Sequence, residues 1–86
     1  MTSNRPSTID GLDVNEVKDG LIVYESSSDR VHYLNATASI VFTLCDGSHT
    51  ASAMADLIAV AFGLDKPPTV EVDDCLAILA KEGLLK

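Results

Sequence analysis

The spacing of hydrophobic residues changes close to Asn35. Before this residue, short runs of β-branched and aromatic side chains are separated by polar turns, which is typical of β-strands. After it, apolar residues recur every three or four positions, as they do on the buried side of a helix. The sequence therefore predicts an α+β fold in which a three-stranded antiparallel sheet is followed by three helices.

Three short segments in the first part of the chain are expected to be strands. Asp19-Gly20 and the polar residues 26–29 separate them, and linkers this short favour antiparallel pairing of neighbours. Side chains alternate between the two faces of a strand, so the second and third strands each present two apolar sets. The strands are expected at residues 14–18, 21–24 and 30–34. One face is expected to carry Ile22, Tyr24, Val31 and Tyr33, and the other Leu21, Val23, His32 and Leu34.

A capping residue before each helix and a glycine after it divide the rest of the chain into three helices. Asn35 is expected to cap the first helix and Thr69 the third. Either Ser48 or Thr50 is expected to cap the second. The helices are expected over residues 36–45, from that cap to residue 62, and over residues 69–82. Their buried sides are expected to hold Ile40, Val41, Leu44, Met54, Leu57, Ile58, Ala61, Phe62, Val72, Cys75, Leu76 and Leu79.

The length of 86 residues suits one domain. Residues 1–8 are polar, with no hydrophobic stretch behind Arg5, so they do not resemble a signal peptide. Residues 1–11 are expected to be a flexible tail. Residues 12–86 form the expected domain. No apolar run reaches the ~18 residues that a membrane span needs. Cys45 and Cys75 are expected as buried thiols in a reducing compartment, which predicts a cytoplasmic protein.

The charge of the chain argues against two classes of partner. Lys and Arg total 6 and Asp and Glu total 13, which gives a net charge of −7. The six basic residues are scattered singly, whereas nucleic-acid binders cluster them to neutralise phosphates. Nucleic acid and anionic membrane surfaces are therefore not expected as partners.

No group of residues predicts catalysis, a cofactor or a metal site. The only histidines are His32 and His49, and neither stands in a nucleophile–base motif. Glu71, Asp73 and Asp74 gather at the start of the third helix, where carboxylates complement the helix dipole. The glycines form no nucleotide-binding motif. The chain is therefore expected to be a binding protein and not an enzyme.

Several local patterns point to one known family. Residues 30–35 read Arg-Val-His-Tyr-Leu-Asn, residues 36–38 begin a helix rich in alanine, and residues 44–47 end it with Asp-Gly. A threonine cap at Thr50 and the Gly-Leu-Leu at residues 83–85 also fit. In these features the chain resembles the PqqD-like family, and the resemblance extends from about residue 12 to residue 85.

This resemblance implies a winged helix-turn-helix-like domain that recognises ribosomally synthesised, post-translationally modified peptides. The leader segment of the precursor peptide would add as a strand to the third strand and lie against the third helix. A separate modifying enzyme, such as a radical SAM enzyme or a lasso-peptide leader peptidase and cyclase, would then act on it. The residues expected to contact the peptide are Arg30, Val31, His32, Tyr33, Leu34, Val72, Asp73, Leu76 and Leu79.

Physical arguments support this expectation. An edge strand offers unpaired N–H and C=O groups to an added strand. Val31 and Tyr33 are expected to line the site from the strand, and Val72, Leu76 and Leu79 from the helix. Asp73 and Asp74 at its rim favour a leader that carries Lys or Arg.

Two alternative functions and the oligomeric state stay open at this point. The topology also suits a winged-helix DNA-binding regulator, although an acidic recognition helix would repel phosphate. The other alternative is a general protein–protein adaptor with no leader peptide as its client. An exposed edge strand can also pair with a second copy of the chain, which would give a homodimer.

Overall fold

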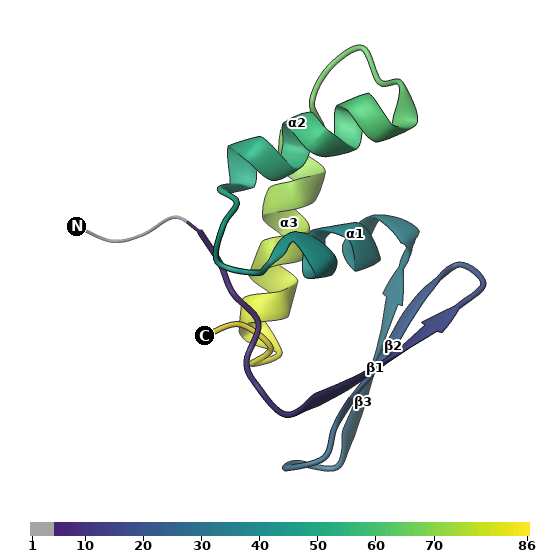
Figure 1. Ribbon diagram of the computed structural model, residues 1–86, viewed down its shortest axis with the longest axis vertical. Helices are drawn as coiled ribbons and strands as arrows, with labels where there is room; N and C mark the ends of the chain where they lie inside the picture. The colour runs from purple at the N-terminus through teal and green to yellow at the C-terminus, as the bar shows by residue number, and fades with distance from the viewer. Residues whose placement is uncertain (1–4) are drawn as a thin grey trace.

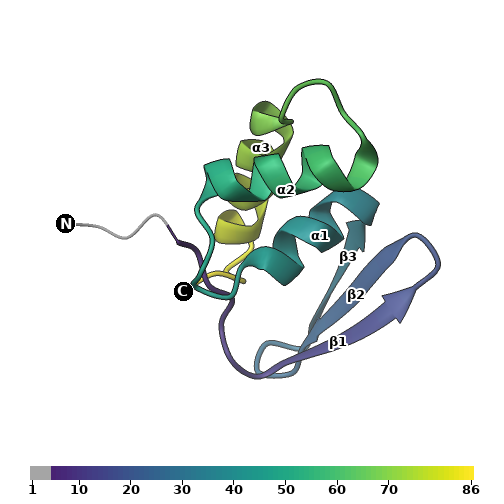
Figure 2. The same ribbon diagram turned by 45° about the horizontal axis from the view of Figure 1, so that its top comes forward.

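The computed structural model describes residues 5–86, and residues 1–4 of the predicted tail lie outside them (Figure 1). Three strands are followed by three helices, which confirms the predicted α+β fold. In Figure 2 the helices lie on one side of the sheet, with α1 nearest to it. The elements are β1 (Leu12–Val17), β2 (Gly20–Glu25), β3 (Arg30–Asn35), α1 (Ala36–Leu44), α2 (Ala51–Phe62) and α3 (Thr69–Lys81).

The sheet has the order β1-β2-β3, and both pairs of neighbours are antiparallel. β2 is therefore the central strand, and β1 and β3 each have one free edge. The register pairs Val23 with His32 and Tyr24 with Val31, which confirms the two predicted side-chain sets. Val23 is fully buried on the helix side, whereas Val31 and Tyr33 on the outer side are 64% and 60% exposed.

Gly20 allows β2 and β3 to approach at the end of the hairpin. A Cβ atom at this position would lie 1.8 Å from the backbone oxygen of Leu34. No side chain fits at that distance, so the last pair of the ladder, Gly20 with Asn35, requires glycine.

The first two helices begin at side-chain caps. Asn35 accepts a hydrogen bond from the Ala38 N–H at 2.9 Å, as predicted. Of the two candidates for α2, Thr50 is the cap, and it accepts from the Ala53 N–H at 3.1 Å. α2 ends at Gly63, whose φ of 64° is the left-handed conformation expected of that glycine.

The start of α3 differs from the prediction. Thr69 is not the cap but the first helical residue, and no side chain caps this helix. Pro68 takes the capping position, and its carbonyl accepts the first helical hydrogen bond from the Val72 N–H at 3.0 Å. Thr69 already has helical geometry, whereas a capping side chain needs a residue in an extended conformation.

The core lies between α1, α2 and α3, and α1 connects it to the inner face of the sheet. On α2 the buried side is narrower than predicted, because Leu57, Ala61 and Phe62 are exposed, Leu57 to 45% and Phe62 to 51%. This helix packs against α1 and α3 but not against the sheet, so a single stripe of residues is covered. Ala55, which was not predicted to be buried, belongs to this covered stripe. The buried apolar residues are Val23, Leu34, Val41, Phe42, Cys45, Met54, Ala55, Ile58, Val72, Leu79 and Leu84.

Part of the segment expected to be a flexible tail pairs with the rest of the domain. The Thr8 N–H donates to the Cys45 carbonyl at 3.0 Å, and the Ile9 N–H donates to the Leu84 carbonyl at 2.9 Å. The Lys86 N–H donates to the Ser7 carbonyl at 2.8 Å. Residues 6–9 therefore run between the end of α1 and the C-terminal segment, because both leave backbone groups without a partner in a helix or in the sheet (Figure 1).

The requirement for glycine at position 20 can be tested by substitution. We expect Gly20→Ala to lower the free energy of unfolding by on the order of 2–3 kcal/mol, because the two backbones must separate to admit the methyl group. Urea denaturation followed by circular dichroism measures the loss. Ser27→Ala in the exposed turn is the control, with an expected change within about 0.5 kcal/mol. Equal stability of the two variants would contradict the close approach.

Candidate functional site

The free edge of β3 lies beside α3 without packing against it. No Cα atom of β3 is within 8 Å of a Cα atom of α3, whereas α1 approaches both elements more closely. α1 starts directly after Asn35 and so separates β3 from α3 at one end. The free edge of β3 and the side of α3 that faces it are called the β3–α3 site below.

Polar side chains join β3 to the end of α3. Arg30 donates to the Glu82 carboxylate and, at 3.3 Å, to the Glu82 carbonyl. His32 lies between two carboxylates, with Nε2 3.4 Å from Glu25 and Nδ1 3.8 Å from Glu82. The imidazole is only 9% exposed, so it forms part of the wall on the helix side of β3.

The structure divides the residues predicted to contact a peptide into two groups. Arg30, His32, Val31 and Tyr33 lie along β3, the last two on its outer face. By contrast, Leu34, Val72 and Leu79 are core residues with 6%, 0% and 1% exposure, so their side chains are not available to a peptide. Leu76 packs against the core, and Asp73 is exposed near the start of α3.

Glu82, which directly follows α3, and two residues of the helix are further candidates that the sequence pattern did not single out. Glu82 follows the helix and contacts Arg30, and Cys75 and Ile78 precede Glu82 by seven and four positions. That spacing puts all three on one side of the helix. Ile78 is 58% exposed and Cys75 is partly buried. Their periodicity is visible in the sequence, but the Arg30 contact that identifies this side as the one facing β3 is not.

Both cysteines are free thiols that favour the protonated form. Burial, followed by the neighbouring Asp46 carboxylate, raises the pKa of Cys45 from 9.0 to about 11. Burial, followed by Asp74 and Glu71, also raises the pKa of Cys75. Neither group is an activated nucleophile at neutral pH.

The second histidine belongs to a local turn. Asp46 accepts from the Ser48 N–H at 2.9 Å and lies 3.2 Å from the His49 ring. The hydrogen bonds from Ser48, with a smaller effect of His49, lower the pKa of the Asp46 carboxyl. These contacts stabilise the turn between α1 and α2, so Asp46, Ser48 and His49 have a structural role.

Among residues 5–86, no group of three His, Cys, Asp or Glu side chains has the arrangement of a metal site. The same residues include no helix that is both long enough and apolar enough to cross a membrane.

Comparison with known proteins identifies the family. Residues 20–85 match the family described as Coenzyme PQQ synthesis protein D (PqqD). The chain belongs to the PqqD family. β1 precedes the matched residues of this PqqD-family chain. None of the curated proteins matches its sequence.

A solved structure has the same fold as this PqqD-family domain. It is described as TbiB1 in complex with the TbiA(beta) leader peptide. The two superpose with a TM-score of 0.77 over 93% of this chain and 94% of that chain, at 20% sequence identity. The similarity therefore extends over the whole arrangement of three strands and three helices.

The two thiols should react differently in the folded protein. We expect iodoacetamide to modify Cys75 first, at a rate that rises mainly at alkaline pH, because burial raises the pKa of this thiol above its usual value and the thiolate is the reactive form. Cys45 should react only when the protein unfolds, since it is 2% exposed. Mass spectrometry of peptides after timed labelling measures both rates. Labelling in urea is the control, and equal rates in the folded state would contradict the assigned burial.

Proposed function

We propose that this domain binds the leader segment of a ribosomally synthesised precursor peptide and presents it to a separate modifying enzyme. The observation that carries the proposal is the free edge of β3, which faces α3 across an interval with no backbone contact. The leader would lie there as a fourth strand of the sheet. TbiB1, which has the same fold, is described in complex with a leader peptide, and this supports the proposal.

Backbone groups of β3 would supply affinity that does not depend on the leader's sequence. β3 pairs with β2 on one side only, so N–H and C=O groups on its other side are directed away from the sheet. A peptide strand that pairs with them alternates its side chains between the two faces. One set would lie between His32 on β3 and Ile78 on α3. The other would lie beside Val31 and Tyr33 on the outer face.

Apolar side chains at alternate leader positions would supply specificity. Val31, Tyr33 and Ile78 are all more than half exposed without a peptide, and an added strand would cover part of each. Removing apolar surface from water contributes roughly 25 cal/mol per Å². Cys75 lies one turn before Ile78, so it would contact the same set of leader side chains.

Electrostatics indicate the kind of leader that would bind. Glu71, Asp73 and Asp74 are exposed on the first half of α3. Arg30, the basic residue of β3, is already paired with Glu82. The rim is therefore acidic and would attract a leader that carries Lys or Arg. The same carboxylates would repel the phosphates of DNA.

The enzyme that acts on the bound leader would be a radical SAM enzyme or the leader peptidase and cyclase of a lasso-peptide pathway. The domain itself would contribute binding and orientation. Its thiols favour the protonated form, and residues 5–86 contain no grouped metal ligands. The chemical step would therefore take place on the partner.

Binding should be visible in an NMR titration with the leader half of the precursor encoded beside this gene. We expect amide shifts along Arg30–Asn35 and α3, with a dissociation constant in the roughly nM to µM range. Ile78→Asp should weaken binding by about 10-fold or more, because the new carboxylate would lose water without gaining a partner. Val60→Asp on α2 is the matched control, since Val60 is 83% exposed and distant in the chain from either element of the site.

Two results would contradict strand addition to β3. One is the absence of shifts at about millimolar peptide. The other is equal weakening by Ile78→Asp and Val60→Asp, which would mean that the added charge, and not the site, determines binding.

The acidic rim makes a separate prediction about rate. We expect the double variant Asp73→Asn and Asp74→Asn to slow association with a basic leader at low salt and to change dissociation little, because exposed charges act mainly by steering. Stopped-flow fluorescence at about 20 and about 500 mM NaCl measures the effect, which should disappear at the higher salt. An effect independent of salt would show that these carboxylates contact the peptide directly.

A further inference from the structure

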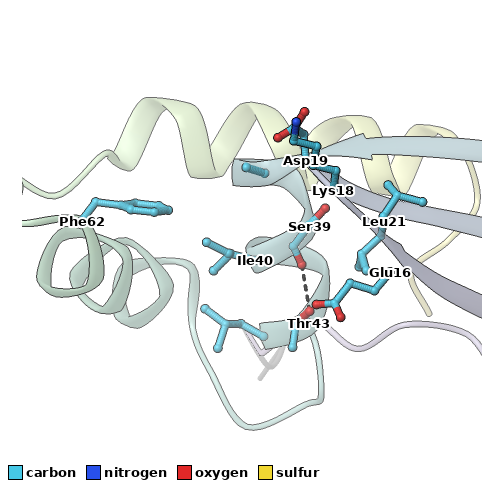
Figure 3. Close-up of a pocket in the computed structure, with 12 residues that line it drawn as sticks. Glu16, Lys18, Asp19, Leu21, Ser39, Ile40, Thr43 and Phe62 are labelled. Atoms are coloured by element: carbon cyan, nitrogen blue, oxygen red, sulfur yellow. Dashed lines mark hydrogen bonds between the residues drawn. The ribbon is translucent and has the colours of Figure 1, made fainter.

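A hollow lies beside the β1–β2 hairpin, separate from the β3–α3 site. It is a pocket of about 440 Å³ between the β1–β2 hairpin, α1 and the end of α2 (Figure 3). The β3–α3 site uses the free edge of β3, whereas this pocket adjoins the other free edge of the sheet, that of β1. Its main lining residues are Glu16, Val17, Leu21, Ile40, Leu44 and Phe62.

The pocket suits an apolar side chain. Figure 3 shows the Phe62 ring directed toward Ile40 from one side, with Leu21 on the opposite wall. Phe62 is 51% exposed, which leaves an aromatic face uncovered at the rim. The two hydroxyl groups within the pocket are already engaged, because the Thr43 hydroxyl donates to the Ser39 carbonyl at 2.9 Å and the Ser39 hydroxyl donates to the Asn35 carbonyl at 2.7 Å. A guest would meet mostly hydrocarbon there.

β1 offers an open strand beside this pocket. β1 packs against β2 alone, and none of its Cα atoms lies within 8 Å of a Cα atom in a helix. Its four interior residues, 13–16, are all exposed. An extended segment can pair with such an edge through main-chain hydrogen bonds. A side chain on the helix-facing side of that segment would be directed toward the pocket.

The charge around β1 selects a basic segment. Carboxylates recur along the strand and its two ends, at Asp10, Asp13, Glu16 and Asp19, against a single Lys18. Among residues 5–86, no ion pair engages any of these five side chains. A second copy of β1 paired on this edge would bring like charges together, which disfavours self-association through β1.

We propose that the β1 edge and the hairpin pocket form a docking site for an extended, basic segment of the modifying enzyme, which inserts one large apolar side chain between Leu21, Ile40 and Phe62. The assignment of the partner as that enzyme rests on the function proposed above. Because the two free edges lie on opposite sides of the sheet, leader and enzyme would be bound at the same time. β2 would then connect them through one continuous sheet.

The site can be tested with a defined probe. Isotope-labelled protein, alone and saturated with leader, is titrated with a synthetic peptide KTKFKTK, which alternates lysines with one central phenylalanine. We expect amide shifts at residues 12–21 and at Ile40 and Phe62, in the presence and absence of leader. The peptides ETEFETE and KTKAKTK should shift these amides weakly or not at all.

Two variants locate the contacts. We expect Phe62→Ala to weaken KTKFKTK binding by about tenfold, because one wall of the pocket is lost. Val60→Ala on the same helix is the matched control. Glu16→Lys should weaken binding by roughly two- to fivefold at low salt and less at about 500 mM NaCl. None of these substitutions should change leader affinity.

Four outcomes would overturn the inference. They are equal binding of KTKAKTK and KTKFKTK, shifts spread over all acidic surfaces, displacement of KTKFKTK by the leader, and a concentration-dependent dimer that buries β1 in sedimentation experiments. Leader binding is read separately at Arg30–Asn35. Failure there would count against the proposed function and the assignment of the enzyme as partner, whereas failure at β1 alone would count against the docking site and leave leader binding intact.

Discussion

Every other part of this domain depends on the position of β2. This strand forms backbone ladders on both sides, and its inner residue Val23 is fully buried against the helices. β1 and β3 belong to the sheet only through β2, since they do not pair with each other. The close backbone approach at Gly20 ties β2 to the residue that starts α1, because Asn35 is at once the last residue of β3 and the helix cap. The sheet therefore continues directly into the helices at Asn35.

Because β2 is the central strand, the sheet has two free edges, one on β1 and one on β3. The surroundings of these two edges differ. At β3 the edge faces α3, and exposed apolar residues stand on both sides of it, Val31 and Tyr33 on the strand and Ile78 on the helix. At β1 no helix is near, carboxylates are unpaired among the described residues, and a pocket opens beside the strand. A flat, apolar edge strand favours aggregation through pairing with other chains. The acidic residues on β1 reduce this tendency, and they also restrict binding to partners that are not acidic.

Much of the fold could be predicted from the sequence because its signals are local. The change in hydrophobic spacing at Asn35, the Asp19-Gly20 turn and the Thr50 cap each depend on a few neighbouring residues. The candidate site was less predictable, because α3 has apolar residues on two sides. Val72 and Leu79 fill the core, whereas Ile78 faces β3, and only the tertiary contact between Arg30 and Glu82 distinguishes the two sides. The ordered part of the predicted tail was missed for the same reason, since residues 6–9 pair with residues distant in the chain.

The pairing of Thr8 with Leu85 brings residues from near the two ends of the described chain side by side. A domain whose ends are adjacent can be placed inside a loop of a larger protein without pulling either end out of position. The same geometry would permit a circular permutant in which a short linker joins the ends and the chain opens in the exposed turn at residues 26–28. The domain is therefore built as a unit that can be transferred between proteins, with its two strand edges left unobstructed by the connection.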